Sequence, residues 1–122
     1  LIHSKNADKQ RLKLIEECGE LASAILKNDI ELQKDSLGDV FVVLTILEAQ
    51  LGLKLDWSIE KHNKESFYHY MKAIIGSPIN YAGYLFPLSE VINHDLTECA
   101  NLAYNEIKNR KGKTENGTFI KD

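Results

Sequence analysis

The chain has 122 residues, of which 43% are hydrophobic and 27% are charged, so it is long enough for one domain with a single hydrophobic core. Its net charge of -3 argues against general nucleic-acid binding, and its longest apolar run, near residues 40 to 47, is far too short to cross a membrane. We therefore expect a single domain over residues 1–122 whose partners are neither nucleic acids nor membranes.

The two cysteines, Cys18 and Cys99, lie far apart in the sequence and match no zinc-ligand spacing. A disulfide between them is one alternative, but two cysteines within helices are more typical of free thiols in a reducing cytoplasm. No signal peptide is recognisable, so we expect a cytoplasmic protein. The chain starts at Leu1 without an initiating Met, which leaves open whether a preceding segment belongs to the fold.

Apolar residues recur at helical spacing through nearly the whole chain, and only two prolines occur, so we predict an all-α fold. A first helix is expected from about Ala7 to Lys27, and a second from about Ile30 to Leu51, closed by Gly52. Inside the second helix, Gly38 costs roughly 1 kcal/mol relative to Ala. Such a residue predicts either a close approach of another helix or room for a ligand.

The rest of the chain is predicted as further helices with a break at residues 76–78. The middle region, 54–76, has helical spacing, a short helix is expected over 80–93, and a last helix runs from an Asp95 N-cap to about 109 or 110. The polar residues after Gly112 are expected to be loosely held. The sequence thus predicts a helical bundle of four to five helices.

The second helix is apolar on nearly all sides between Val40 and Leu47. That is more apolar surface than one thin bundle can cover. We therefore expect oligomerisation to complete the bundle, as a homodimer or a homotetramer.

Two acidic clusters stand on the first two helices: Glu16, Glu17 and Glu20 on one, Asp35 and Asp39 on the other. On an arbitrary helix, glutamates with this spacing more often form a face that is simply exposed to solvent. Here Glu17 borders the apolar stripe, and positions 20 and 39 are nearly equidistant from the turn near residue 29 or 30, so antiparallel helices would bring the clusters together. Carboxylates gathered beside core residues favour a bound cation, and Mg2+ prefers oxygen ligands and phosphate.

A basic run near the C-terminus includes Lys108, Arg110 and Lys111. Taken alone, it is more typical of a helix end that complements the helix dipole. Beside an acidic metal site it predicts a phosphate-binding segment, because Arg binds phosphate oxygens bidentately and Lys neutralises charge.

Three segments carry a resemblance to a known family: Glu-Glu-Cys-Gly-Glu-Leu from Glu16, Asp-Ser-Leu-Gly-Asp-Val from Asp35, and Tyr-Asn-Glu-Ile-Lys-Asn-Arg-Lys-Gly-Lys from Tyr104. They resemble the MazG-like family of all-α nucleotide pyrophosphohydrolases, over residues 10 to about 53 and 96 to about 121. The family pattern is Glu-x-x-Glu followed by Glu-x-x-Asp, and Glu17, Glu20 and Asp39 match three of its positions.

Ser36 stands where the family has its third carboxylate. Asp35, one residue earlier, shares roughly the face of Asp39, so it is a candidate to replace that ligand directly or through water. The alternative is a site of three carboxylates.

The resemblance implies that a nucleoside triphosphate is cut between its α and β phosphates, which gives a monophosphate and pyrophosphate. Mg2+, with Mn2+ as a substitute, would be held by the acidic side chains Glu17, Glu20, Asp35 and Asp39. Glu16 is the candidate to position or deprotonate the attacking water, with Glu17 beside it. The candidate substrate-binding residues are Lys13, Asn105, Lys108, Arg110 and Lys111, and Gln10 is a further candidate for sugar or base contact.

A rival interpretation is a catalytically silent module of the same fold, which binds nucleotide or acts as a scaffold. Ser36 in place of a carboxylate is the feature that favours it.

Overall fold

The computed structural model describes residues 4–59, 64–109, 112–115 and 118–121 of the chain. The described part confirms the predicted all-α class and adds one short hairpin. The elements in chain order are α1 Ser4–Leu26, α2 Ile30–Leu51, α3 Phe67–Gly76, α4 Pro78–Tyr81, the 3-10 helix η1 Ala82–Tyr84, α5 Leu85–Val91, α6 Leu96–Asn109, β1 Gly112–Glu115 and β2 Thr118–Lys121.

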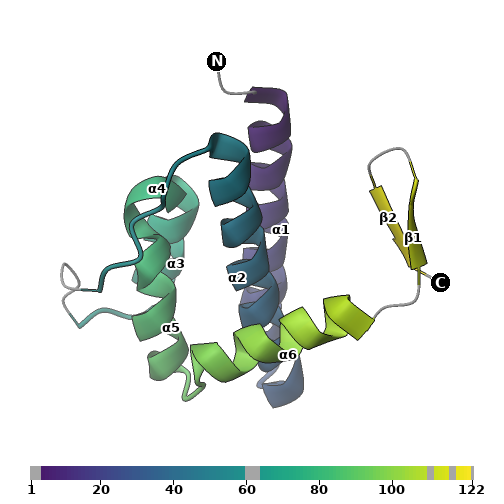
Figure 1. Cartoon of the computed structure of the whole chain (residues 1–122). Coiled ribbons are helices and arrows are strands. Elements are labelled where there is room, and N and C mark those ends of the chain that lie inside the picture. Colours follow the sequence, from purple (N-terminus) through teal and green to yellow (C-terminus); the bar gives the residue numbers. More distant parts are fainter. Residues whose placement is uncertain (1–3, 60–63, 110–111, 116–117, 122) are drawn as a thin grey trace.

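Helices α1 and α2 form an antiparallel pair that runs the length of the molecule (Figure 1). The chain reverses through Asn28, whose φ of 53° is left-handed, and the side chain of Asp29 caps α2 by accepting a hydrogen bond from the Leu32 amide at 3.1 Å. Gly52, with a φ of 65°, ends the helix in the left-handed conformation that glycine tolerates. The predicted bounds of the second helix are therefore confirmed.

The predicted helix over residues 54–76 is wrong for its described residues before Phe67, and residues 60–63 lie outside the described part of the chain. Residues 54–59 form no helix, and α3 begins only at Phe67, after the N-cap Ser66. The cause is a carboxylate on α2, because Glu48 Oε2 accepts hydrogen bonds from the backbone of Leu55 at 2.7 Å and from the Trp57 indole at 3.2 Å. These contacts hold the segment in an irregular path against α2.

The break at 76–78 is confirmed, but the helix expected over 80–93 is divided into the short elements α4, η1 and α5. The predicted cap of the last helix is confirmed, because Asp95 Oδ1 accepts hydrogen bonds from the amides of Thr97 and Glu98 at 2.9 and 3.3 Å.

Helix α6 crosses α2 at a steep angle (Figure 1) and makes its closest approach at Gly38. A Cβ added at Gly38 would overlap the carbonyl oxygen of Cys99 and would lie 2.8 Å from the Ala103 Cβ. The close helix approach, one of the two explanations predicted for this glycine, is therefore present.

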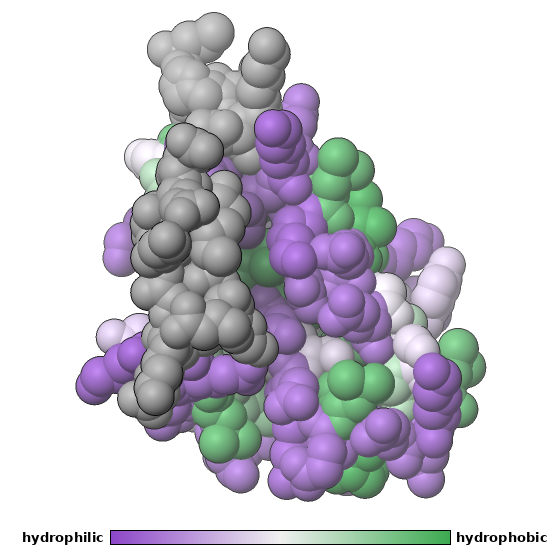
Figure 2. Space-filling model, turned by 90° about the vertical axis from the view of Figure 1, so that its right-hand side faces the viewer, coloured by the Kyte–Doolittle hydropathy of each residue, from purple (hydrophilic) through white to green (hydrophobic). Residues whose placement is uncertain are grey.

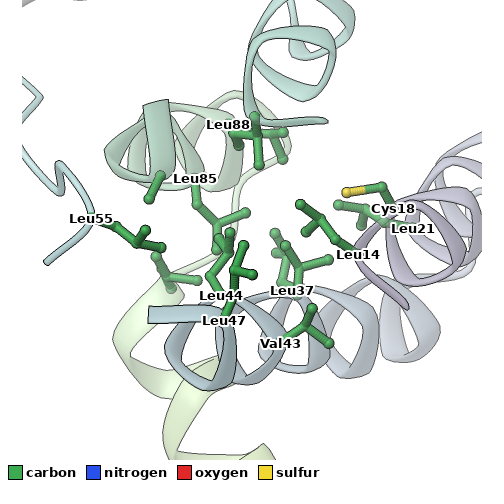
Figure 3. Packing of buried hydrophobic residues seen from close by; sticks show 14 of the residues in the cluster. Leu14, Cys18, Leu21, Leu37, Val43, Leu44, Leu47, Leu55, Leu85 and Leu88 are labelled. Atoms are coloured by element: carbon green, nitrogen blue, oxygen red, sulfur yellow. The ribbon is translucent and has the colours of Figure 1, made fainter. Parts of the chain in front are cut away.

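The core lies between the α1–α2 pair and α5, where leucines from the three helices interdigitate (Figure 3). Cys18 and Cys99 are free and buried, as predicted. Within the described part of the chain, every helix falls short of the length and hydrophobicity that a membrane crossing requires. Figure 2, a view of one side of the molecule, shows hydrophobic residues in separate patches among hydrophilic ones.

The chain after Gly112 differs from the expectation of a loosely held tail. Strands β1 and β2 pair antiparallel, with Gly112 opposite Lys121 and Glu115 opposite Thr118. The sequence signal that could have predicted this hairpin is Asn116-Gly117, a dipeptide typical of two-residue hairpin turns, followed by β-prone residues.

Candidate functional site

Three carboxylates meet at the interface of α1 and α2. Each of Glu17, Glu20 and Asp39 offers one oxygen that lies within 4.8 Å of the others. Glu17 is only 7% exposed, whereas Asp39 is half-buried and Glu20 is exposed. The antiparallel pairing of the two helices thus brings together three of the four side chains that the symmetry about the turn had predicted, without Asp35.

Glu17 is the buried member of the three. Its Oε1 lies 3.4 Å from the Lys13 Nζ, but its Oε2 is buried and has no hydrogen-bond partner in the described structure. Burial, the charge of Asp39 and the carboxyl of Glu20 together raise the pKa of Glu17 to about 7. A buried carboxylate oxygen without a partner is costly, and a divalent cation would satisfy it. The three side chains therefore fit a metal ion.

A cavity of about 540 Å3 opens beside these carboxylates, between α1, α2 and α6. This volume lies in the range of small-molecule sites. Its polar lining consists of Lys9, Gln10, Lys13, Glu17, Asp39 and Glu106. Its apolar lining consists of Val42, Val43, Ile46, Ala103 and Ile107. The cavity thus has acidic, basic and apolar parts in its wall. Such a lining suits a ligand that has both a charged and an apolar part.

Two residues predicted to contact the substrate, Lys13 and Gln10, line the cavity. Lys13 also lies beside the acidic residues. Its Nζ lies 2.7 Å from Glu16 Oε1 as well as 3.4 Å from Glu17 Oε1. The hydrogen bond to Glu16 is the largest of the contributions that raise the pKa of Lys13, so the amine stays charged. Glu16 itself is exposed and is not among the described residues that line the cavity, but its ion pair with Lys13 connects it to a residue that does.

Asp35 lies apart from the three clustered carboxylates. It is exposed, and neither the group of oxygens within 4.8 Å nor the described cavity lining includes it. Burial, followed by the charges of Glu106, Glu31 and Asp29, raises the pKa of Asp35. The carboxylate across from Asp35 is therefore Glu106 on α6.

The remaining predicted substrate-binding residues belong to the end of α6 or follow it. Asn105 and Lys108 are exposed and are not among the described residues that line the cavity. Arg110 and Lys111 lie outside the described residues. Their predicted contacts with phosphate stay predictions.

Lys9 and Glu106 line the cavity although neither was predicted from the sequence. Lys9 is one helical turn before Lys13, so helical periodicity could have indicated it. Glu106 lies within the Tyr-Asn-Glu-Ile segment, but its place follows from the packing of Ala103, three residues earlier, against Gly38. Gly38 indicated a close approach of some helix to α2, but the local sequence does not indicate that this helix is α6.

Residues 6–67 match the model of the MazG nucleotide pyrophosphohydrolase domain, over half of the chain. The chain belongs to the MazG family. It is also 48% identical over 50 residues to an uncharacterized 18.2 kDa protein in the rep-hol intergenic region of Haemophilus phage HP1 (strain HP1c1). That match covers 41% of this chain and 31% of the phage protein, so the chain spans about a third of that relative. No solved structure matches the chain.

The segment that matches the MazG domain contains α1 and α2 and therefore the three clustered carboxylates. Helix α6, which supplies the third wall of the cavity, lies beyond the matched residues. In this MazG chain, the acidic centre thus belongs to the family segment, and part of the cavity is built by residues outside it.

Proposed function

We propose that this MazG-family chain is a Mg2+-dependent nucleoside triphosphate pyrophosphohydrolase that releases a nucleoside monophosphate and pyrophosphate. The observation that carries the proposal is the unpartnered, buried oxygen of Glu17 beside Glu20 and Asp39 at the wall of a cavity. The resemblance of the chain to the family supplies the reaction, and this geometry supports it.

Glu17, Glu20 and Asp39 would hold the ion, with Mg2+ as the preferred metal and Mn2+ as a substitute. A bound divalent ion neutralises phosphate oxygens and lowers the pKa of a coordinated water. Glu17 lines the cavity and would be available to such a water, whereas Glu16 would act on the site through its ion pair with Lys13. We therefore assign Glu16 to positioning Lys13.

The charged and the apolar parts of the cavity wall lie on different helices, the lysines on α1 and apolar residues on α2, so they would contact different parts of a nucleotide. Lys9 and Lys13 would neutralise the phosphates, and the apolar surface of Val42 and Ile46 would contact the nucleoside. Lys108, Arg110 and Lys111 remain candidates to hold the leaving pyrophosphate, and Asn105 remains a candidate contact to sugar or base.

The test is product analysis of a panel of ribo-, deoxyribo- and modified nucleoside triphosphates, with and without Mg2+, resolved by chromatography. We expect monophosphate and pyrophosphate from a subset of the panel, and at least a hundredfold slower turnover for Glu17→Gln. Glu90→Gln, an exposed carboxylate on α5, is the matched control and should behave as the parent. Diphosphate and phosphate as products would show that the bond assignment is incorrect.

A catalytically silent nucleotide-binding module is the second candidate, and it rests on Ser36. This residue is 1% exposed, and its Oγ has no hydrogen-bond partner in the described structure, so a neutral side chain stands where the family has a carboxylate. Nucleotide binding by calorimetry without turnover of any nucleotide in the panel would favour this candidate.

We also propose that the chain forms a homodimer or homotetramer in the cytoplasm. Exposed apolar side chains on α1, among them Leu12, Ile15 and Leu26, support an interface, and the two free buried thiols support a reducing compartment. Light scattering coupled to size exclusion tests the oligomeric state, and a monomer at all concentrations would contradict it.

A further inference from the structure

We propose that Glu106 on α6 supplies the fourth carboxylate of the metal site, in place of the one that Ser36 lacks. This inference rests on the proposed metal-dependent function. Glu106 would act across the cavity, by accepting hydrogen bonds from water that the ion retains, and it would orient the attacking water in that way.

The packing of α6 on α2 fixes where Glu106 lies. Gly38 leaves no room for a side chain against Cys99 and Ala103, so α6 is held at one position along α2. Glu106 follows Ala103 by three residues and therefore shares its side of the helix. Both residues line the cavity that Glu17 and Asp39 also line.

The acidic residues that line the cavity come from three helices: Glu17 from α1, Asp39 from α2 and Glu106 from α6. Glu20 of α1 is clustered with Glu17 and Asp39. The unpartnered Oε2 of the buried Glu17 independently indicates that this group of carboxylates accommodates a cation. Without a cation, like charges would repel one another across the cavity.

Glu106 is better placed than Asp35 to replace the missing carboxylate. Asp35 was the candidate from sequence, but it is absent from the described lining of the cavity, whereas Glu106 is part of it. Burial and then the charge of Glu106 raise the pKa of Asp35, so the two carboxylates interact electrostatically. An effect of Asp35 on the metal would therefore be transmitted through Glu106.

Contact through water fits both the geometry and the ion. Glu106 is outside the group of oxygens that lie within 4.8 Å of one another, so it does not share one ion directly with all three of them. Mg2+ dehydrates reluctantly and usually keeps several waters. Residues that hold such ligands in place typically change metal affinity or activity by about 10- to 100-fold when replaced.

The experiment measures Mn2+ binding to the full chain by electron paramagnetic resonance in the absence of nucleotide, and hydrolysis separately. Four variants are compared with the parent: Glu106→Gln, Glu106→Asp, Asp35→Asn and Glu98→Gln. Glu98 is the matched control, because it is the other described carboxylate on α6 and lies in the first turn, away from the cavity. Circular dichroism verifies that each variant keeps its helices.

We expect Glu106→Gln to weaken Mn2+ binding by about tenfold or more, Glu106→Asp to restore part of it, and the other two variants to resemble the parent. Loss of binding in Asp35→Asn but not in Glu106→Gln would overturn the proposal in favour of Asp35. Parental binding in both would also overturn it and leave a site of three carboxylates.

The outcome also separates this proposal from the proposed function. Mn2+ binding that depends on Glu106, without hydrolysis of any nucleotide, would support the role of Glu106 and contradict the enzyme. Hydrolysis and Mn2+ binding that both require Glu17 but not Glu106 would support the enzyme and overturn the role of Glu106. No binding of Mn2+ by the parent would overturn both.

Discussion

Replacing Glu17 by Gln should stabilise the metal-free protein at alkaline pH, although it should abolish metal binding. The pKa of Glu17 is raised from 4.5 to about 7 in the folded state, first by burial and then by the charge of Asp39 and the carboxyl of Glu20. Folding therefore disfavours the ionised form. Stability is greatest below the unfolded pKa and is lost as the pH rises through the folded pKa near 7.

The size of the effect follows from that shift. One pKa unit corresponds to about 1.4 kcal/mol, so a shift from 4.5 to about 7 sets an upper limit of about 3.5 kcal/mol. Solvent in the open cavity screens the interaction, and we take about 2 kcal/mol as the expected gain for Glu17→Gln at pH 8. For a domain of this size, that raises the melting temperature by about 8 °C. At pH 5 Glu17 is neutral in the folded protein but already partly ionised in the unfolded chain, so the difference in melting temperature should be much smaller than at pH 8.

The assay is thermal unfolding of the parent, Glu17→Gln and the control Glu90→Gln from pH 5 to pH 8, with a chelator and then with saturating Mg2+. We expect Mg2+ to stabilise the parent and leave Glu17→Gln unchanged, because only the parent can use the ion to neutralise Glu17. A metal-free variant no more stable than the parent at pH 8, or a difference that does not grow with pH, would refute the reasoning.

Three further predictions concern the metal, the helix crossing and the irregular segment. Binding of Mg2+ at pH 6.5 should release a proton from Glu17, so the calorimetric heat should vary with the ionisation enthalpy of the buffer; equal heats in all buffers would contradict this. Gly38→Ala should destabilise the fold by about 2 kcal/mol in urea unfolding, since the new methyl group would overlap the backbone of Cys99. Glu48→Ala should cost about 2 kcal/mol and change Trp57 fluorescence, because it leaves the indole N–H without its acceptor.

The features that the sequence predicted correctly are set by local rules. Asp29 and Gly52 define the ends of α2 because a capping carboxylate and a left-handed glycine act on backbone groups within one turn. The meeting of Glu20 and Asp39 follows from the same rules, since two helices of known ends and one tight turn determine which positions face each other. Periodicity and two caps therefore sufficed to predict that Glu17, Glu20 and Asp39 meet, but they also placed Asp35 in the group, which the structure does not.

The features that the sequence did not predict depend on contacts between distant residues. Glu48 binds the backbone of Leu55 and the Trp57 side chain, and this interaction overrides the helical spacing that residues 54–59 display. The apolar residues in that segment pack against the core along an irregular path. The spacing of apolar residues alone cannot distinguish such a path from a helix. The place of Glu106 depends in the same way on the crossing of α6 over α2.

The two walls of the cavity are held in place by different interactions: one by the α1–α2 pair, the other by the crossing of α6 at Gly38. Glu17 and Asp39 are placed by a helix pair whose geometry is fixed by its turn, so substitutions elsewhere should hardly move them. The opposite wall, with Glu106 and Ile107, is placed by the fit of α6 against one glycine, so a larger residue at position 38 would displace the whole wall. Such a substitution should therefore alter nucleotide preference and the role of Glu106 while the three clustered carboxylates keep their arrangement. A Gly38→Ala protein that still folds should bind Mn2+ through Glu17, but its Mn2+ affinity should no longer depend on Glu106. In that case Glu106→Gln would weaken Mn2+ binding in the parent but not in Gly38→Ala. The effects of the two substitutions would then not be additive in the double variant.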